Sequence, residues 1–146
     1  MERIIQEKIS ADHLLYVSLK YAKTTDVILN LISRWKSMID LSIDRLLERA
    51  KKKKIVSVIP IAPKLKLEAL KKVYKKNEEI MATLGIYELF KRIASSERTI
   101  ENEFRKHVTL KVFDKGEWIS IDIEKLKEYA GIVERFISQV KQILTK

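Results

Sequence analysis

The sequence predicts a mainly α-helical protein: an up-and-down bundle of four to five helices with a small β-hairpin before the last helix. The 146 residues suit one domain, so residues 1–146 are expected to form a single helical-bundle domain. Three Gly and two Pro leave few sites for turns, whereas 45 Ile, Leu and Val residues supply a core. Apolar residues recur every three or four positions along most of the chain, which is the spacing of amphipathic helices.

The N-terminal part predicts two helices. Apolar residues at positions 5, 9, 15 and 19 indicate a first helix over about residues 3–22. Thr24 and Asp26 then offer side-chain acceptors for the unpaired amides of a new first turn. A long apolar stripe follows and predicts a helix over about residues 25–52: Ile28, Leu31, Trp35, Ile39, Ile43, Leu46 and Ala50.

The middle of the chain predicts a loop and two further helices. Residues 55–63 are apolar but contain Pro60 and Pro63, which cannot donate backbone hydrogen bonds, so we expect a covered loop or a short extended segment. Helical spacing resumes over about residues 65–84, and Gly85 permits a break or kink. A shorter helix follows from residue 86 to about residue 95, or onward to about residue 105.

The pattern changes to the period of a strand at His107. Residues 108–113 and 118–122 alternate between apolar and polar, and Gly116 supplies the positive φ of the turn between them. We therefore expect a β-hairpin over about residues 107–122 that packs on the helices or on a second subunit, because two strands alone are marginally stable. Asp122 is positioned to cap a final amphipathic helix over about residues 123–145.

The aromatic side chains fall on the apolar stripes of these helices. We expect them to lie in the core or at a subunit interface, ahead of any role in binding a ligand. The residues concerned are Tyr16, Tyr21, Trp35, Phe90 and Phe136.

The formal net charge of +10 is confined to residues 45–76, which we call the basic segment. This segment holds 12 basic residues against Glu48 and Glu68, while the other 114 residues carry 18 basic and 18 acidic side chains. Clustered Lys and Arg displace counterions from a phosphate backbone, so the segment predicts binding of RNA or another polyanion. The residues predicted to make this contact are Arg45, Arg49, Lys51, Lys52, Lys53, Lys54, Lys71, Lys72, Lys75 and Lys76.

The same segment also has a structural interpretation. Lys51–Lys54 follow the end of a predicted helix, where cations are favoured by the helix dipole, and they would then form only a solvated surface. Tyr74 is the single aromatic residue of the segment, so the sequence does not indicate stacking of bases.

A second candidate site lies in the polar stretch Ser95–His107. If this stretch is helical, Arg98 and Arg105 share a face and His107 follows beside them. Two guanidinium groups and an imidazole can hold a phosphate and transfer a proton, which is sufficient for metal-independent cleavage of RNA by its own 2′-hydroxyl. The alternative is structural: Glu97, Glu101 and Glu103 pair with the neighbouring cations along the helix.

Several other classes of function are excluded by composition. With no Cys, the chain has no disulfides, thiolate metal ligands or cysteine nucleophile. Three scattered glycines cannot form a Gly-rich phosphate loop, and the two His residues lack carboxylate partners at metal-binding spacing. We expect no metal site and no cofactor. No apolar run is long enough to cross a membrane and no signal-peptide pattern opens the chain, so we expect a cytoplasmic protein without a membrane partner.

The order of these elements resembles the HEPN superfamily of archaea and bacteria. Arg98–His107 and Leu126–Leu144 fall where that family places its polar motif and its last helix. The resemblance implies a helical fold, dimerisation, and association with nucleotidyltransferases or RNA. Active members place only a few residues between the Arg and the His, whereas eight residues separate Arg98 from His107 and one separates Arg105 from it. The Ile- and Lys-rich composition also looks archaeal.

Three hypotheses of function follow. The first is a non-enzymatic or weakly active homodimeric HEPN-like module that contacts RNA, another polyanion or a partner protein through the basic segment. The second is a metal-independent ribonuclease that uses Arg98, Arg105 and His107. The third is a purely structural bundle that binds a partner protein and no polyanion.

Overall fold

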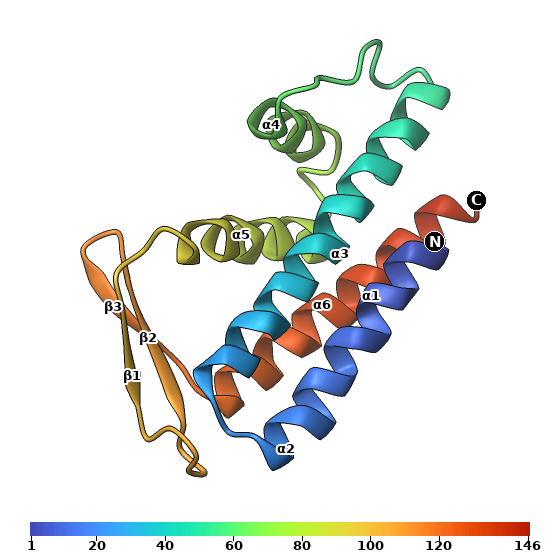
Figure 1. The fold of residues 1–146 in the computed structure, drawn as a ribbon. Helices are drawn as coiled ribbons and strands as arrows, with labels where there is room; N and C mark the ends of the chain where they lie inside the picture. The colour runs from blue at the N-terminus through green and yellow to red at the C-terminus, as the bar shows by residue number, and fades with distance from the viewer.

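Helices make up most of the computed structural model, which describes residues 1–146 (Figure 1). In chain order the elements are α1 (Glu2–His13), the π-helical turn η1 (Leu14–Ser18), α2 (Leu19–Tyr21), α3 (Thr25–Lys52), α4 (Pro63–Val73), α5 (Glu78–Ile93), β1 (Arg98–Glu101), β2 (Thr109–Asp114), β3 (Glu117–Ile121) and α6 (Ile123–Leu144). The prediction of a mainly helical chain with a small antiparallel β element before the last helix is confirmed. No helix combines the length and the apolar character needed to span a membrane.

The long helices begin and end close to the predicted positions, because the expected caps form. The Thr24 hydroxyl accepts a hydrogen bond from the Val27 amide at 3.3 Å and starts α3. The Asp122 carboxylate accepts one from the Lys125 amide at 2.8 Å and starts α6. Residues 2–21 form one continuous rod, in which α1 passes through η1 into α2.

The boundary between the two middle helices differs from the prediction. The chain leaves α4 at Tyr74 and begins α5 at Glu78, whereas Gly85 lies inside an unbroken helix. The Asn77 side chain explains the new start, because its oxygen accepts a hydrogen bond from the Ile80 amide at 3.1 Å. A glycine inside a helix costs only about 1 kcal/mol relative to alanine, so tertiary packing can carry α5 through Gly85.

The sheet has three antiparallel strands in the order β1, β2, β3, one more than the predicted hairpin. Strands β2 and β3 pair in the expected register, with Phe113 opposite Trp118, and Lys115 and Gly116 turn the chain at positive φ. The additional strand β1 replaces the predicted extension of the preceding helix to about residue 105, which is therefore wrong. All four residues of β1 are exposed, so the sequence lacks the alternation of apolar and polar residues that indicates a half-buried strand.

The rods of α1, α3 and α6 lie side by side, while α5 runs across them toward the sheet (Figure 1). At their crossing Trp35 of α3, Phe90 of α5 and Tyr129 of α6 form one aromatic cluster, with ring centroids 5.6 to 6.5 Å apart. Trp35, Phe90 and Phe136 are buried as expected for core residues, but Tyr16 and Tyr21 are exposed. The expected up-and-down arrangement of all helices is not confirmed.

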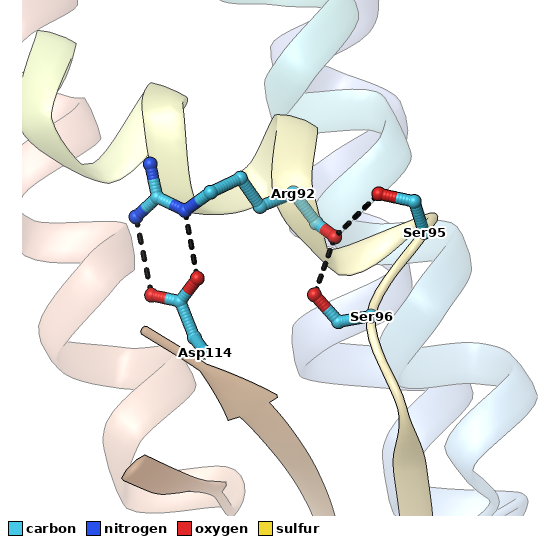
Figure 2. Close-up of polar contacts among 4 residues, drawn as sticks. All are labelled: Arg92, Ser95, Ser96 and Asp114. Carbon is cyan, nitrogen blue, oxygen red and sulfur yellow. Dashed lines mark hydrogen bonds and ion pairs between the residues drawn. The ribbon is translucent and has the colours of Figure 1, made fainter. Parts of the chain in front are cut away.

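The sheet is fastened to α5 by an ion pair (Figure 2). Arg92 donates to both carboxylate oxygens of Asp114, from Nε at 2.7 Å and from the terminal guanidinium nitrogen at 3.1 Å. These hydrogen bonds, together with the guanidinium charge, lower the pKa of Asp114. The hydroxyls of Ser95 and Ser96 donate to the Arg92 carbonyl, at 3.3 and 2.6 Å, and close the end of the helix.

We expect Asp114→Asn to lower the free energy of unfolding by about 1 to 2 kcal/mol at neutral pH, because it breaks a bidentate charged pair beside a buried strand. The lowered pKa of Asp114 means that the stabilisation is complete above about pH 4 and is lost as the pH falls further, so the variant and the native protein should converge in acid. Urea unfolding of both proteins at neutral pH and in acid measures the difference in the free energy of unfolding. Glu117→Gln, an exposed change on the neighbouring strand, is the control and should leave stability unchanged.

Candidate functional site

The basic segment occupies the far end of α3, the loop 53–62, the whole of α4 and residues 74–76 of the turn that follows (Figure 1). Helix α4 returns toward α3 and buries Leu67 and Leu70, while its lysines stay on the other faces. The segment therefore forms one end of the molecule, and its cations come from four successive parts of the chain.

A Schellman motif sets the local geometry where α3 ends. Lys54 adopts φ of 62°, its amide donates to the Lys51 carbonyl at 3.0 Å, and the Ile55 amide donates to the Ala50 carbonyl at 2.9 Å. A lysine thus occupies the left-handed position that glycine usually takes. The cations of the last turn lie at the negative end of the helix dipole, as the structural interpretation predicted.

Most cations of the basic segment have no carboxylate partner. Arg45 lies 3.8 Å from Glu48, Lys66 lies 2.9 Å from Asp44, and Lys71 pairs with Glu88. Eight lysines are exposed and form no ion pair: Lys51, Lys52, Lys53, Lys54, Lys64, Lys72, Lys75 and Lys76. The excess charge is consequently directed to solvent and is not neutralised by the protein itself.

Part of this charge lines a hollow of about 460 Å³ beside the end of α6. Positions 45, 49 and 52 follow one face of α3 and Lys53 comes directly after its end, so their long side chains converge on the same space. The Arg49 guanidinium also donates to the backbone oxygen of Lys146. The residues that line the hollow are Arg45, Glu48, Arg49, Lys52, Lys53, Leu144 and Lys146. Five are cations and one is an acid, an arrangement that attracts anions.

Tyr74 does not serve as a stacking platform. Its side chain is half-buried against the core, and this burial raises the pKa of its hydroxyl, an effect that the nearby charge of Arg49 opposes. The basic segment thus offers cations and aliphatic side chains to a ligand but no exposed aromatic ring.

The structure does not bring Arg98, Arg105 and His107 together on one face. Arg98 begins β1 opposite Val112, and its guanidinium donates to the Ile93 carbonyl at 3.1 Å. Arg105 and His107 are exposed in the connection that follows the other end of this strand, about 10 Å further along the sheet. The helical face on which the ribonuclease hypothesis depends does not form, because residues 98–101 are a strand.

The acidic residues of the same stretch have structural partners that the sequence did not indicate. Glu103 accepts hydrogen bonds from the amide and the hydroxyl of Thr25, at 3.1 and 3.2 Å, and so caps α3 from 78 positions away. Glu101 pairs with Lys111 across the sheet at 3.0 Å. The predicted pairing of these acids with adjacent cations along a helix is therefore wrong.

A further polar cluster joins α3, α4 and α5, and sequence reasoning missed it. The buried Tyr87 hydroxyl donates to Asp40, and burial together with this carboxylate raises the pKa of Tyr87. Lys36 pairs with Asp40 at 3.1 Å, and Lys66 reaches Asp44 across the helices at 2.9 Å. These charges satisfy one another, so the cluster holds helices together. Lys36 and Asp40 lie four apart on α3, a spacing that the sequence does show, but Tyr87 and Lys66 follow at distances that no local pattern reveals.

No group of three or more His, Cys, Asp or Glu side chains lies close enough to hold a metal ion. Comparison of the chain with protein-family models, with curated proteins and with solved structures finds no match. The fold and the surface together define a mainly helical protein with a three-stranded sheet and one strongly basic end. The resemblance to the HEPN superfamily stays a prediction.

Because Arg98 is held away from His107, we expect the chain not to cleave RNA. Single-stranded RNA incubated with the native protein in the presence of a chelator should yield no 2′,3′-cyclic phosphate ends, and His107→Ala should leave the RNA in the same state. Analysis of the RNA ends by mass spectrometry makes the measurement. Cyclic phosphate ends that appear with the native protein and disappear with the variant would contradict the expectation.

Proposed function

We propose that this protein is a non-enzymatic module that binds RNA through the phosphate backbone, using the basic segment at the end of α3 and along α4. The observation that carries the proposal is the set of eight exposed lysines without an ion pair in one continuous part of the chain. The hollow beside the end of α3 adds two arginines to this set.

The physical basis is the release of counterions. Each cation that approaches a phosphate displaces a condensed counterion, so affinity falls steeply as the salt concentration rises. A lysine already paired with a carboxylate contributes little, because it must first give up that partner. Lysines such as Lys51 and Lys72 have no such partner to lose, and their charge is available in full.

The proposal specifies an RNA ligand read by charge and not by sequence. Sequence-specific recognition of single strands depends on bases stacked on aromatic rings or arginine planes. The aromatic residue of the basic segment, Tyr74, is directed toward the core. We therefore expect similar affinities for oligonucleotides of different sequence and equal length.

Replacing the four consecutive lysines Lys51–Lys54 by Gln should weaken RNA binding and flatten its dependence on salt. Each phosphate contact with a single strand contributes a slope of about 0.7 in log affinity against log salt, so the loss of four contacts should reduce the slope by about 3. Fluorescence anisotropy of a labelled single-stranded RNA, titrated with protein at several salt concentrations, measures both quantities. The lysines are exposed, so the fold should persist, and circular dichroism checks this.

The matched control removes the same charge elsewhere. Four exposed lysines outside the segment, which also form no ion pair, are changed to Gln together: Lys20, Lys106, Lys115 and Lys127. This variant has the same net charge as the first and should retain most of the native affinity and slope. Equal loss in the two variants would mean that net charge alone attracts RNA, and absence of binding even at low salt would reject the proposal.

A further inference from the structure

The loop between α3 and α4 exposes its apolar side chains. Residues 55–63 include no charged residue and a single polar one, Ser57. In the structure Ile55, Val58 and Ile61 are 65, 70 and 94% exposed, so the expectation of a covered loop is wrong for these residues. We call these three residues the apolar tip. The loop arches past the ends of both helices, at the top of the view (Figure 1).

The rest of the loop holds the apolar tip outward. Ile59 packs against the core from within the loop. At the start of the loop the amides of Ile55 and Val56 both donate to the Ala50 carbonyl, at 2.9 and 3.4 Å. Pro60 fixes its own φ and so restricts the backbone next to Ile59. The exposed side chains therefore belong to a loop that is supported from the inside.

Unpaired lysines surround the apolar tip. Lys51–Lys54 precede the loop, Lys64 follows it and Lys72 lies on α4, and none of these lysines forms an ion pair. Glu68 is the single acidic residue between Lys51 and Lys72. Ile55 and Lys72 line the same hollow of about 530 Å³, so apolar and cationic side chains are neighbours here. The surface thus combines aliphatic groups with a strong positive charge.

We propose that the apolar tip binds the surface of an anionic lipid bilayer. The aliphatic side chains enter the boundary between headgroups and acyl chains, while the lysines lie against the lipid phosphates. Such attachment is peripheral and requires no membrane-spanning helix, so it replaces the expectation of no membrane partner, which considered spanning segments alone. Stable attachment usually takes two contributions, and this loop supplies both an apolar and a polybasic one.

This inference goes beyond the proposed binding of RNA. RNA and anionic lipids share the phosphate chemistry that lysines attract, but RNA offers no apolar phase to the aliphatic side chains. The unpaired cations around the tip are all lysines, which are compact, strongly hydrated charges on flexible stems. Charges of this kind suit a diffuse layer of mobile headgroups. The apolar tip is therefore the feature that only the lipid explains.

The form of the loop favours a bilayer over a pocket in a protein. Ile61 has almost no contact with its own chain, so no neighbour fixes its side chain for a pocket of one shape. Acyl chains are fluid and receive such a side chain in any orientation. Pro60 and Pro63 have no amide hydrogen, and the amides of Ile55 and Val56 are already bonded, which lowers the cost of bringing this backbone to an apolar boundary.

Changing the apolar tip to serine tests the proposal. Native protein should sediment with vesicles of phosphatidylserine and phosphatidylcholine and bind far less to vesicles of phosphatidylcholine alone. The triple variant Ile55→Ser, Val58→Ser, Ile61→Ser should bind the anionic vesicles at least about 100-fold more weakly, because burial of each aliphatic side chain contributes roughly tenfold. Its charge is unchanged, so its affinity for single-stranded RNA should equal that of the native protein.

The matched control removes two Ile and one Val from other parts of the surface. Ile9→Ser, Val17→Ser and Ile100→Ser are combined, since these residues are 40 to 63% exposed outside the basic segment. This variant should bind the anionic vesicles as the native protein does. No binding of native protein, full binding by the tip variant, equal loss in the control, or loss of RNA binding together with vesicle binding in the tip variant would each overturn the proposal.

The absence of cysteine from the chain allows a direct test of insertion. Ile61→Cys and Ile100→Cys proteins each carry one environment-sensitive fluorophore on the new thiol. On anionic vesicles the emission from position 61 should move to shorter wavelength, as expected for a label in an apolar boundary, and the emission from position 100 should not change. A label at position 61 that reports water while the protein is bound to vesicles would contradict insertion of the tip.

Discussion

Burial of the apolar stripe of α3 is the constraint on which the rest of the structure depends. This 28-residue helix places Trp35 at the crossing of α5 and α6 and receives α1 along one side. Glu103, in the loop after β1, caps the beginning of α3, so this hydrogen bond connects the sheet to the helices. The last turns of α3 extend beyond this packed centre, and Ala50 is the last residue of the helix that must be apolar because it is buried. The four lysines that follow are under no such requirement, and all four are exposed.

The cations of the molecule thus fall into two groups: those that pair with a carboxylate of the fold and those that have no such partner. Ion pairs such as Arg92 with Asp114 and Lys66 with Asp44 join elements that are distant in the chain, and each cation has its acid. The lysines of the loop 53–62 and the outer face of α4 have none. For the proposed binding of RNA, pairing matters more than the number of cations, because a cation already held by a carboxylate offers little to a phosphate.

The sequence could predict the features that local physics determines. Caps at Thr24 and Asp122, the stripe of α3 and the turn at Gly116 follow from neighbouring residues, and each is found. The errors occur where distant contacts decide. Residues 98–101 form a strand only because β2 lies beside them, and their exposure removes the alternation that would have indicated it. The Tyr87 hydroxyl that donates to Asp40 and the Glu103 cap on Thr25 come from far along the chain, so no spacing rule could reveal them.

The most direct test of the account is an NMR titration of the isotope-labelled protein with single-stranded RNA, followed through the backbone amide and lysine side-chain signals. We predict that signals of residues 45–76 shift progressively and that those of the loop 102–107 stay in place. Shifts centred on Arg105 and His107 would relocate the binding site to the polar stretch, and a spectrum unchanged by RNA would contradict the account altogether.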